Sequence, residues 1–481
     1  MRALGRRGRR GRRGLRGEVA RLRLRHPSPI LPAAAVLLAL VGCSAGSGDP
    51  APGGIATSPS GMPSTSGAVS ARSPQSGLDH EVSAMAALNE LLATRVSALA
   101  AHDAAAWTAT IADPAGTAGV AELAAYQGLV ALGVRDLVVG DGPPGPGQAG
   151  GTSGSASAGL SDSWTGSVRL GYTIPGFDRG TRWVSRTVTL ARADGRWRIQ
   201  SWRGPADRWE PFDLPDLQVV RTERSLVAGP VSLDVLRARL ADVELGQNQV
   251  AAVLGRWVPA VVIVSATAEQ SGRLLGAALA PSLSAGPGQA VSDGQLAATT
   301  HGDRAPASPA LADRVILDPV GLAQLTAAGR RVVLTHELTH VAVRASTLHD
   351  VPLWLSEGFA EWVAFRAERL DPRVVAARLL DRVRRSGAPT SLPSPADFAG
   401  ATGDPVTAYQ ASWLAAARIA ADAGESGLVR IVHLMGGVVG EVPSSAPPVA
   451  LDRALRIVLG SGEDQLVADW RGDLNRLAGA G

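Results

Sequence analysis

The segment HELTH, residues 336–340, constrains the fold of this chain more than any other stretch. It lies within the helical pattern GLAQLTAAGRRVVLTHELTHVAVRAS, residues 321–346. On a helix, His336 and His340 project from the same face about one turn apart. Two imidazoles in that arrangement can hold one metal ion, and Glu337 is placed to act on a water without binding the metal. The alternative is that the two histidines belong to a hydrophobic core.

A catalytic zinc ion needs a third protein ligand and an open position for water. The pattern H-E-x-x-H-x-x-G-x-x-H would supply a third histidine, but Val343 and Ser346 occupy its glycine and histidine positions. Glu357 follows His340 by 17 residues, in WLSEGFAEW, beyond a predicted turn and at the start of a second predicted helix. An antiparallel return of this length can place Glu357 opposite both histidines. Alternatively, it is an acid favoured in the first turn of a helix.

HELTH followed by WLSEGFAEW resembles the gluzincin metallopeptidases, and more particularly the aminopeptidase-related peptidase domains of bacterial exported proteins. The resemblance implies one Zn²⁺ held by His336, His340 and Glu357, with Glu337 as the general base. It also implies that Glu361 accepts a hydrogen bond from a zinc-bound histidine. The alternative for Glu361 is a surface acid.

A later tyrosine stabilises the oxyanion in the related enzymes, and Tyr409 in TAYQASWLAAARIA matches that position; otherwise it is a half-buried core residue. The G-x-M-E-N segment with which related aminopeptidases bind a free amino group has no counterpart in the chain. The resemblance therefore favours cleavage within a peptide or a narrow specificity.

The amino end has the pattern of an export signal. ILPAAAVLLALVG, residues 30–42, is apolar but shorter than the about 20 residues of a spanning helix. Cys43 follows in LVGC, which resembles the lipobox of bacterial lipoproteins. We expect a signal peptide over residues 1–42, lipidation of Cys43, and export to the outer face of the cell membrane with the membrane as a partner. Residues 43–77, rich in Gly, Ser and Pro, are predicted to form a disordered tether.

The net charge of +4 comes from the amino end. Residues 1–42 hold eleven of the 47 basic residues and one acidic residue, so the remainder carries a formal charge of −6. A nucleic-acid-binding domain would need basic residues on its folded part. Nucleic acid is therefore excluded as a predicted partner, and a peptide or protein substrate is expected instead.

Two folded domains are predicted, and the fold class is α+β. Residues 78–205 begin with helical periodicity and continue with strand-like segments, including 129–140 and a hairpin at RADGRW. This layout resembles the cone-like α+β fold of nuclear transport factors, with an antiparallel sheet and a supporting, protein-binding or regulatory role.

Residues 215–481 are predicted to form a mostly helical zincin-type peptidase domain with a small sheet, in which DRVILDP, residues 313–319, is the edge strand that pairs with substrate. The prediction is an exported, zinc-dependent peptidase. The alternative is a non-enzymatic lipoprotein with a vestigial metal site that binds a ligand or a partner protein. The oligomeric state stays open.

Overall fold

The computed structural model describes residues 74–140, 154–155, 163–204, 208–275, 297–300, 307–368, 370–399 and 403–479. The predicted signal peptide, Cys43 and residues 44–73 lie outside the described residues. The last four residues of the predicted tether already belong to helix α1 (Pro74–Ala101). Among the described helices, none combines the length and apolar character that crossing a membrane requires.

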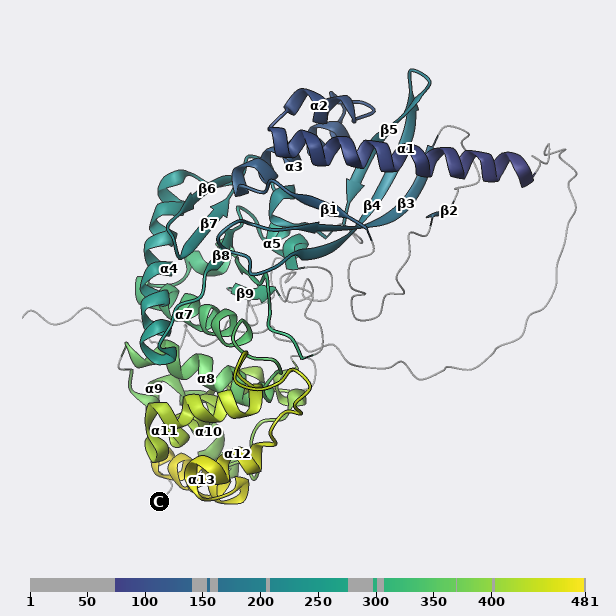
Figure 1. Ribbon diagram of the computed structural model, residues 1–481. Coiled ribbons are helices and arrows are strands. Elements are labelled where there is room, and N and C mark those ends of the chain that lie inside the picture. The colour runs from purple at the N-terminus through teal and green to yellow at the C-terminus, as the bar shows by residue number, and fades with distance from the viewer. Residues whose placement is uncertain are drawn as a thin grey trace, which may run out of the picture.

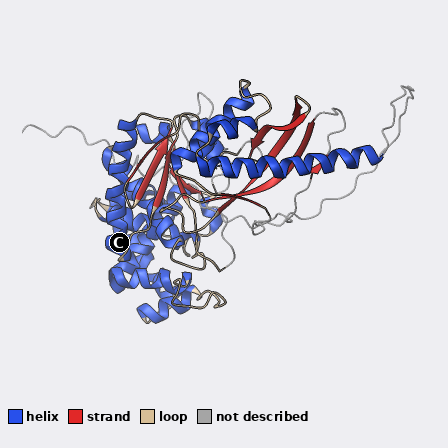
Figure 2. Cartoon of the chain, turned by 45° about the horizontal axis from the view of Figure 1, so that its top comes forward, coloured by secondary structure: helices blue, strands red, loops and turns tan. Residues whose placement is uncertain are grey.

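The first domain packs helices along a curled antiparallel sheet, and Figures 1 and 2 show α1 running beside that sheet. The strands are ordered β1-β3-β4-β5, and β2 pairs with β3. Its other elements are α2 (Ala104–Ala109), α3 (Thr117–Leu132), β1 (Leu137–Val139), β2 (Gly154–Ser155), β3 (Ser163–Tyr172), β4 (Arg182–Ala193) and β5 (Arg196–Arg203). Helices therefore precede an antiparallel sheet, as the periodicity predicts.

Two local predictions for this domain have different outcomes. Asp194 and Gly195, with φ of 51° and 75°, form the β4–β5 hairpin, as the Asp-Gly signal predicts. The strand predicted over 129–140 is wrong in its first half. Leu129–Leu132 end helix α3, which Gly133 caps in the left-handed conformation, and only Leu137–Val139 form a strand.

The second domain contains a mixed five-stranded sheet in the order β6-β7-β8-β10-β9. Its strands are β6 (Gln218–Arg221), β7 (Ser225–Gly229), β8 (Ala260–Val264), β9 (Ala297–Thr300) and β10 (Arg314–Leu317). The central strands β7, β8 and β10 are parallel, while β6 and β9 are antiparallel to their neighbours. The prediction that DRVILDP is an edge strand is wrong, because β9 pairs with β10 and takes the edge.

Helices make up the rest of the second domain (Figure 1). They are α4 (Leu233–Leu254), α5 (Ala268–Leu275), α6 (Pro319–Ala323), α7 (Ala327–Arg344), α8 (Leu353–Arg366), α9 (Pro372–Val375), α10 (Ala377–Ser386), α11 (Pro405–Gly436), α12 (Leu451–Leu459) and α13 (Glu463–Ala478). Gly424, with φ of 73°, kinks α11. The mixed α and β content agrees with the predicted α+β class.

The second sheet belongs to the cores of both domains. Successive side chains of a strand point to opposite faces, and here Val262 packs in the helical core while Val261 and Ile263 pack with the first domain. On β10, Ile316 likewise packs with the first domain. The two domains are consequently joined by a continuous apolar interface, not only by the connecting chain.

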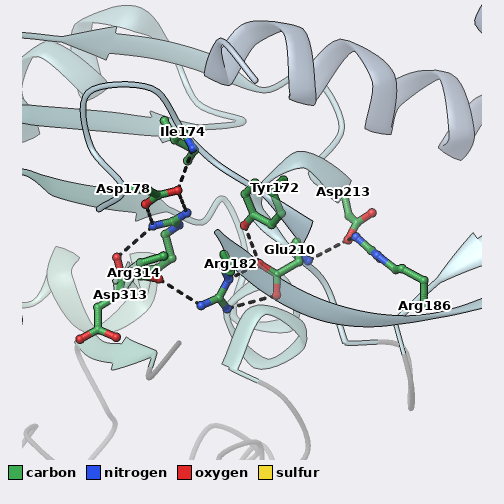
Figure 3. Close-up of polar contacts among 10 residues, drawn as sticks. Tyr172, Ile174, Asp178, Arg182, Arg186, Glu210, Asp213, Asp313 and Arg314 are labelled. Atoms are coloured by element: carbon green, nitrogen blue, oxygen red, sulfur yellow. Dashed lines mark hydrogen bonds and ion pairs between the residues drawn. The ribbon is translucent and has the colours of Figure 1, made fainter. Parts of the chain in front are cut away.

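The connection around the short 3₁₀ helix η3 (Pro211–Asp213) is anchored inside the first domain (Figure 3). Glu210 pairs with Arg182 at 2.8 Å, and Asp213 pairs with Arg186 at 2.8 Å. Phe212 is fully buried, and the backbone of α3 approaches it so closely at Gly128 that a Cβ there would lie 2.4 Å from its carbonyl oxygen. This segment therefore fills space between α3 and the sheet.

Candidate metal centre

Helix α7 carries HELTH in its second half. Thr326 caps its N-terminus by accepting a hydrogen bond from the amide of Gly329. Helix α4 packs closely against it, since a Cβ on Gly246 would lie 2.9 Å from Leu338. The helix is therefore held in a packed interior, where the predicted spacing brings His336 and His340 to one face.

Helix α8 follows α7 after a short turn and carries Glu357. The turn between α7 and α8 is fixed from outside, because the amides of Leu348 and His349 donate to the carbonyl of Gly436. His349 is half-buried, and its Nε2 lies 2.9 Å from the carbonyl oxygen of Ala446. The turn of the hairpin is thus held by the C-terminal end of α11 and by the segment that follows it.

Gly358, directly after Glu357, explains how α8 approaches α11. A Cβ at Gly358 would lie 2.3 Å from the carbonyl oxygen of Ser412. Only glycine permits this backbone contact. The Glu-Gly dipeptide therefore sets the depth at which α8, and with it Glu357, sits in the helical core.

The three predicted ligands converge. Nε2 of His336 lies 3.2 Å and Nε2 of His340 lies 3.4 Å from Oε2 of Glu357, and the two imidazole nitrogens are 3.0 Å apart. All three residues are buried, and their ligand atoms lie within 4.8 Å of one another. Two imidazole nitrogens and a carboxylate oxygen this close together form a donor set that can hold a divalent metal ion.

The charges in this group favour an ionised Glu357. Burial alone would raise the pKa of Glu357, but His340 and His336 outweigh it and hold the pKa well below its usual range. Burial alone would lower the pKa of His340, but the neighbouring Glu357 raises it. The carboxylate is therefore available as a ligand without further deprotonation.

Glu337 lies near this group and is 4% exposed. Its charge contributes to the raised pKa of His340 and to that of Glu361. The structure thus brings the predicted base to the same buried cluster as the predicted ligands.

Glu361 is fully buried but does not make the predicted hydrogen bond to a histidine. Neither of its carboxyl oxygens has a hydrogen-bond partner, and Nδ1 of His336 has none either. Burial, followed by the charges of Glu357 and Glu337, raises the pKa of Glu361 well above its usual value. This carboxyl is therefore buried beside the cluster in surroundings that disfavour its charged form, and it is not the surface acid of the alternative interpretation.

Ser356 is the contact that sequence reasoning missed. Its hydroxyl lies 3.4 Å from Nδ1 of His340, the nitrogen that faces away from the ligand group. Such a contact orients an imidazole that binds a metal through its other nitrogen. The sequence does contain a signal for this contact, because Ser356 directly precedes the predicted ligand Glu357 on α8.

Tyr409 is buried on α11, three residues before Ser412. Its ring packs edge-on against Phe398, with the ring centroids 5.2 Å apart. The tyrosine is therefore on the helix that contacts α8 beside Glu357, and it is more deeply buried than the half-buried alternative expects.

Comparisons with known proteins found no family model and no curated protein that matches this chain.

Proposed function

We propose that this protein is a zinc-dependent peptidase, exported and held at the outer face of the membrane by a lipid on Cys43. The observation that carries the proposal is the convergence of His336, His340 and Glu357, with Glu337 beside them in the buried cluster. A His₂Glu donor set with an adjacent unligated glutamate is typical of hydrolytic zinc sites, whereas structural zinc is closed by four protein ligands.

His336, His340 and Glu357 would hold the zinc ion. Zinc at that position supplies Lewis-acid polarisation of the scissile carbonyl and lowers the pKa of water. Glu337 takes a proton from the attacking water and delivers it to the leaving amine. Ser356 orients the His340 ring, and Tyr409 donates a hydrogen bond to the developing oxyanion.

The substrate proposed is an extended peptide. Among the strands that the structure describes, β9 is the edge of the second sheet, and it is antiparallel to β10. Backbone groups at a free sheet edge can pair with an extended segment of another chain. The lack of a G-x-M-E-N segment supports cleavage within the peptide over removal of its terminal residue.

One observation favours the non-enzymatic alternative. Glu337 and the three proposed ligands are each at most 4% exposed, which suits a closed site that binds metal without turnover. In that case the protein is a cell-surface lipoprotein whose metal group stabilises the helical domain. In the first domain, Phe212 fills space between α3 and the sheet, which argues against a ligand site at that place.

The deciding experiment uses purified full-length protein loaded with zinc and a mixed peptide library read by mass spectrometry. Glu337→Gln keeps the proposed ligands and removes the base, so cleavage should fall by about 10²–10⁴-fold with zinc still bound at one equivalent. Glu269→Gln, on an exposed turn of α5, is the matched control and should cleave like the parent. A parent that binds zinc but cuts nothing contradicts the peptidase proposal and supports the alternative.

A further inference from the structure

The segment between β3 and β4, residues 173–181, reaches from the first domain into the second. We call it the β3–β4 tip. The amide of Arg179 donates to the carbonyl of Leu311 at 2.8 Å. Asp178 accepts hydrogen bonds from both terminal nitrogens of Arg314, the second of them at 2.8 Å, and also from the amide of Ile174 (Figure 3). The carboxylate is thereby fixed inside the tip while it binds β10.

Asp313 extends the connection between the two domains to helix α7, which carries His336 and His340. Its side chain points away from the cluster around Arg314 in Figure 3 and accepts a hydrogen bond at 3.0 Å from Nε of Arg344, in the last turn of α7. The backbone follows the same path, since the amide of Ala310 donates to the carbonyl of Arg344. Asp313 therefore contacts α7 while its neighbour Arg314 contacts the first domain, and the two residues together join α7 to that domain.

The β3–β4 tip also binds α7 directly. Arg179 Nη1 donates to the carbonyl of Ala345, the C-terminal cap of α7. The last carbonyls of a helix have no partner within the helix, and a cation there is favoured by the helix dipole. Arg179 thus supplies both a donor and a positive charge at the end of the helix that carries His340.

The position of this helix end matters for the metal group. His340 lies little more than one turn before Ala345, and the turn that leads to α8 starts immediately after it. A shift of the last turn of α7 relative to α8 changes the separation of His340 from Glu357, whose atoms are now 3.4 Å apart. A metal site requires its ligands at closely defined distances.

We propose that the β3–β4 tip is a positioning element of the metal site: Arg179 and Asp178 hold the C-terminal end of α7 so that His340 meets Glu357. The inference rests on the proposed metal binding. It assigns to the first domain the role of positioning the end of α7. Arg179 and Asp178 act through Ala345 and Arg314 and not as ligands themselves, so they are positioning residues.

The test measures zinc affinity of the full-length protein by competition with a chelating dye. Arg179 is exposed in part, so Arg179→Met should fold, and we expect its zinc affinity to fall about 10-fold or more. Arg179→Lys, which keeps a donor and a charge, should lose less. The visible spectrum of the Co²⁺-substituted protein should change in Arg179→Met, because it reports ligand geometry.

Two controls separate positioning from general stability. Arg237→Met removes an exposed ion pair with Asp234 on α4 and should change neither readout. Asp178→Asn is compared with Arg95→Met, which breaks a buried ion pair with Glu122 elsewhere in the first domain. Only Asp178→Asn should alter the Co²⁺ spectrum of the folded fraction.

The inference is overturned if Arg179→Met has the zinc affinity and the Co²⁺ spectrum of the parent. It is also overturned if Arg95→Met changes both readouts as much as Arg179→Met does. A parent that binds no zinc overturns both this inference and the proposed function. A parent that binds zinc without cleaving peptides leaves the positioning role standing and rejects only the peptidase.

Discussion

Asp313 and Arg314 are neighbours in the chain, but their side chains form ion pairs with different domains. Asp313 pairs with Arg344 of helix α7, and Arg314 pairs with Asp178 of the first domain. The Arg314 and Asp178 side chains are each only 1% exposed. Buried charges of this kind must be paired, because a single unpaired one is strongly destabilising.

Arg314→Met is therefore expected to lower the free energy of unfolding by about 3–5 kcal/mol, since it leaves the Asp178 carboxylate buried without its partner. The two domains share the second sheet, so parent and variant should each unfold in a single transition by differential scanning calorimetry. Two separate transitions in the parent would contradict this expectation.

Gly358→Ala is expected to destabilise the protein by about 1–3 kcal/mol, because the added methyl group meets the Ser412 carbonyl oxygen and forces α8 away from α11. Urea unfolding measures the change. Gly472→Ala, in α13, meets nothing within 4 Å and is the matched control. There the alanine should raise stability by about 0.5–1 kcal/mol, because it favours the helix.

Stability of the zinc-free protein should be greatest at mildly acidic pH. The raised pKa of folded His340 gives a contribution that is complete below its ordinary pKa of 6.5 and is lost as pH rises through the folded pKa. The lowered pKa of Glu357 gives a second contribution to stability. It is present above the ordinary glutamate pKa of 4.5 and is lost as pH falls through the folded pKa. Urea unfolding at pH 5.5 and 8 should thus show lower stability at pH 8.

His340→Gln should remove most of that difference between pH 5.5 and pH 8. Zinc affinity should change in the opposite direction and rise over the same range, since the imidazoles must lose their protons to bind metal. A zinc-free parent that is more stable at pH 8 than at pH 5.5 would show that the His340–Glu357 pair does not form.

Glu361→Gln is expected to leave the stability of the zinc-free protein nearly unchanged, within about 0.5 kcal/mol. The carboxyl is buried without a hydrogen-bond partner and its pKa is raised, so an uncharged amide of the same shape resembles the protonated form that burial favours. Thermal unfolding at pH 7 gives the comparison. A loss of several kcal/mol would mean that Glu361 is ionised and bound in the folded protein.

The helical hairpin was predictable because its signals are local. The four-residue spacing of His336 and His340 and the 17-residue return to Glu357 require a helix, a turn and a second helix, and the structure has all three. The depth of α8 was not predictable, because Gly358 becomes informative only when its neighbour Ser412, more than 50 residues away, is known.

Other features escaped prediction for related reasons. Strand β9, AATT, is short and has no apolar alternation, so its pairing with β10 leaves no periodic signal in the sequence. Arg182, Arg314 and Asp178 look like surface residues in the sequence, where charged side chains are usually solvated. Their partners are 28 to 136 residues away, and only the folded chain brings them together.

The shared second sheet also decides where this chain can be divided for laboratory work. A fragment starting at the Pro-rich connection near residue 215 retains all five strands but uncovers Leu226, Val261 and Ile316, which the first domain now covers. An apolar sheet face released in this way favours self-association. Truncations made for expression or crystallisation should keep both domains together, beginning before α1 and ending after α13.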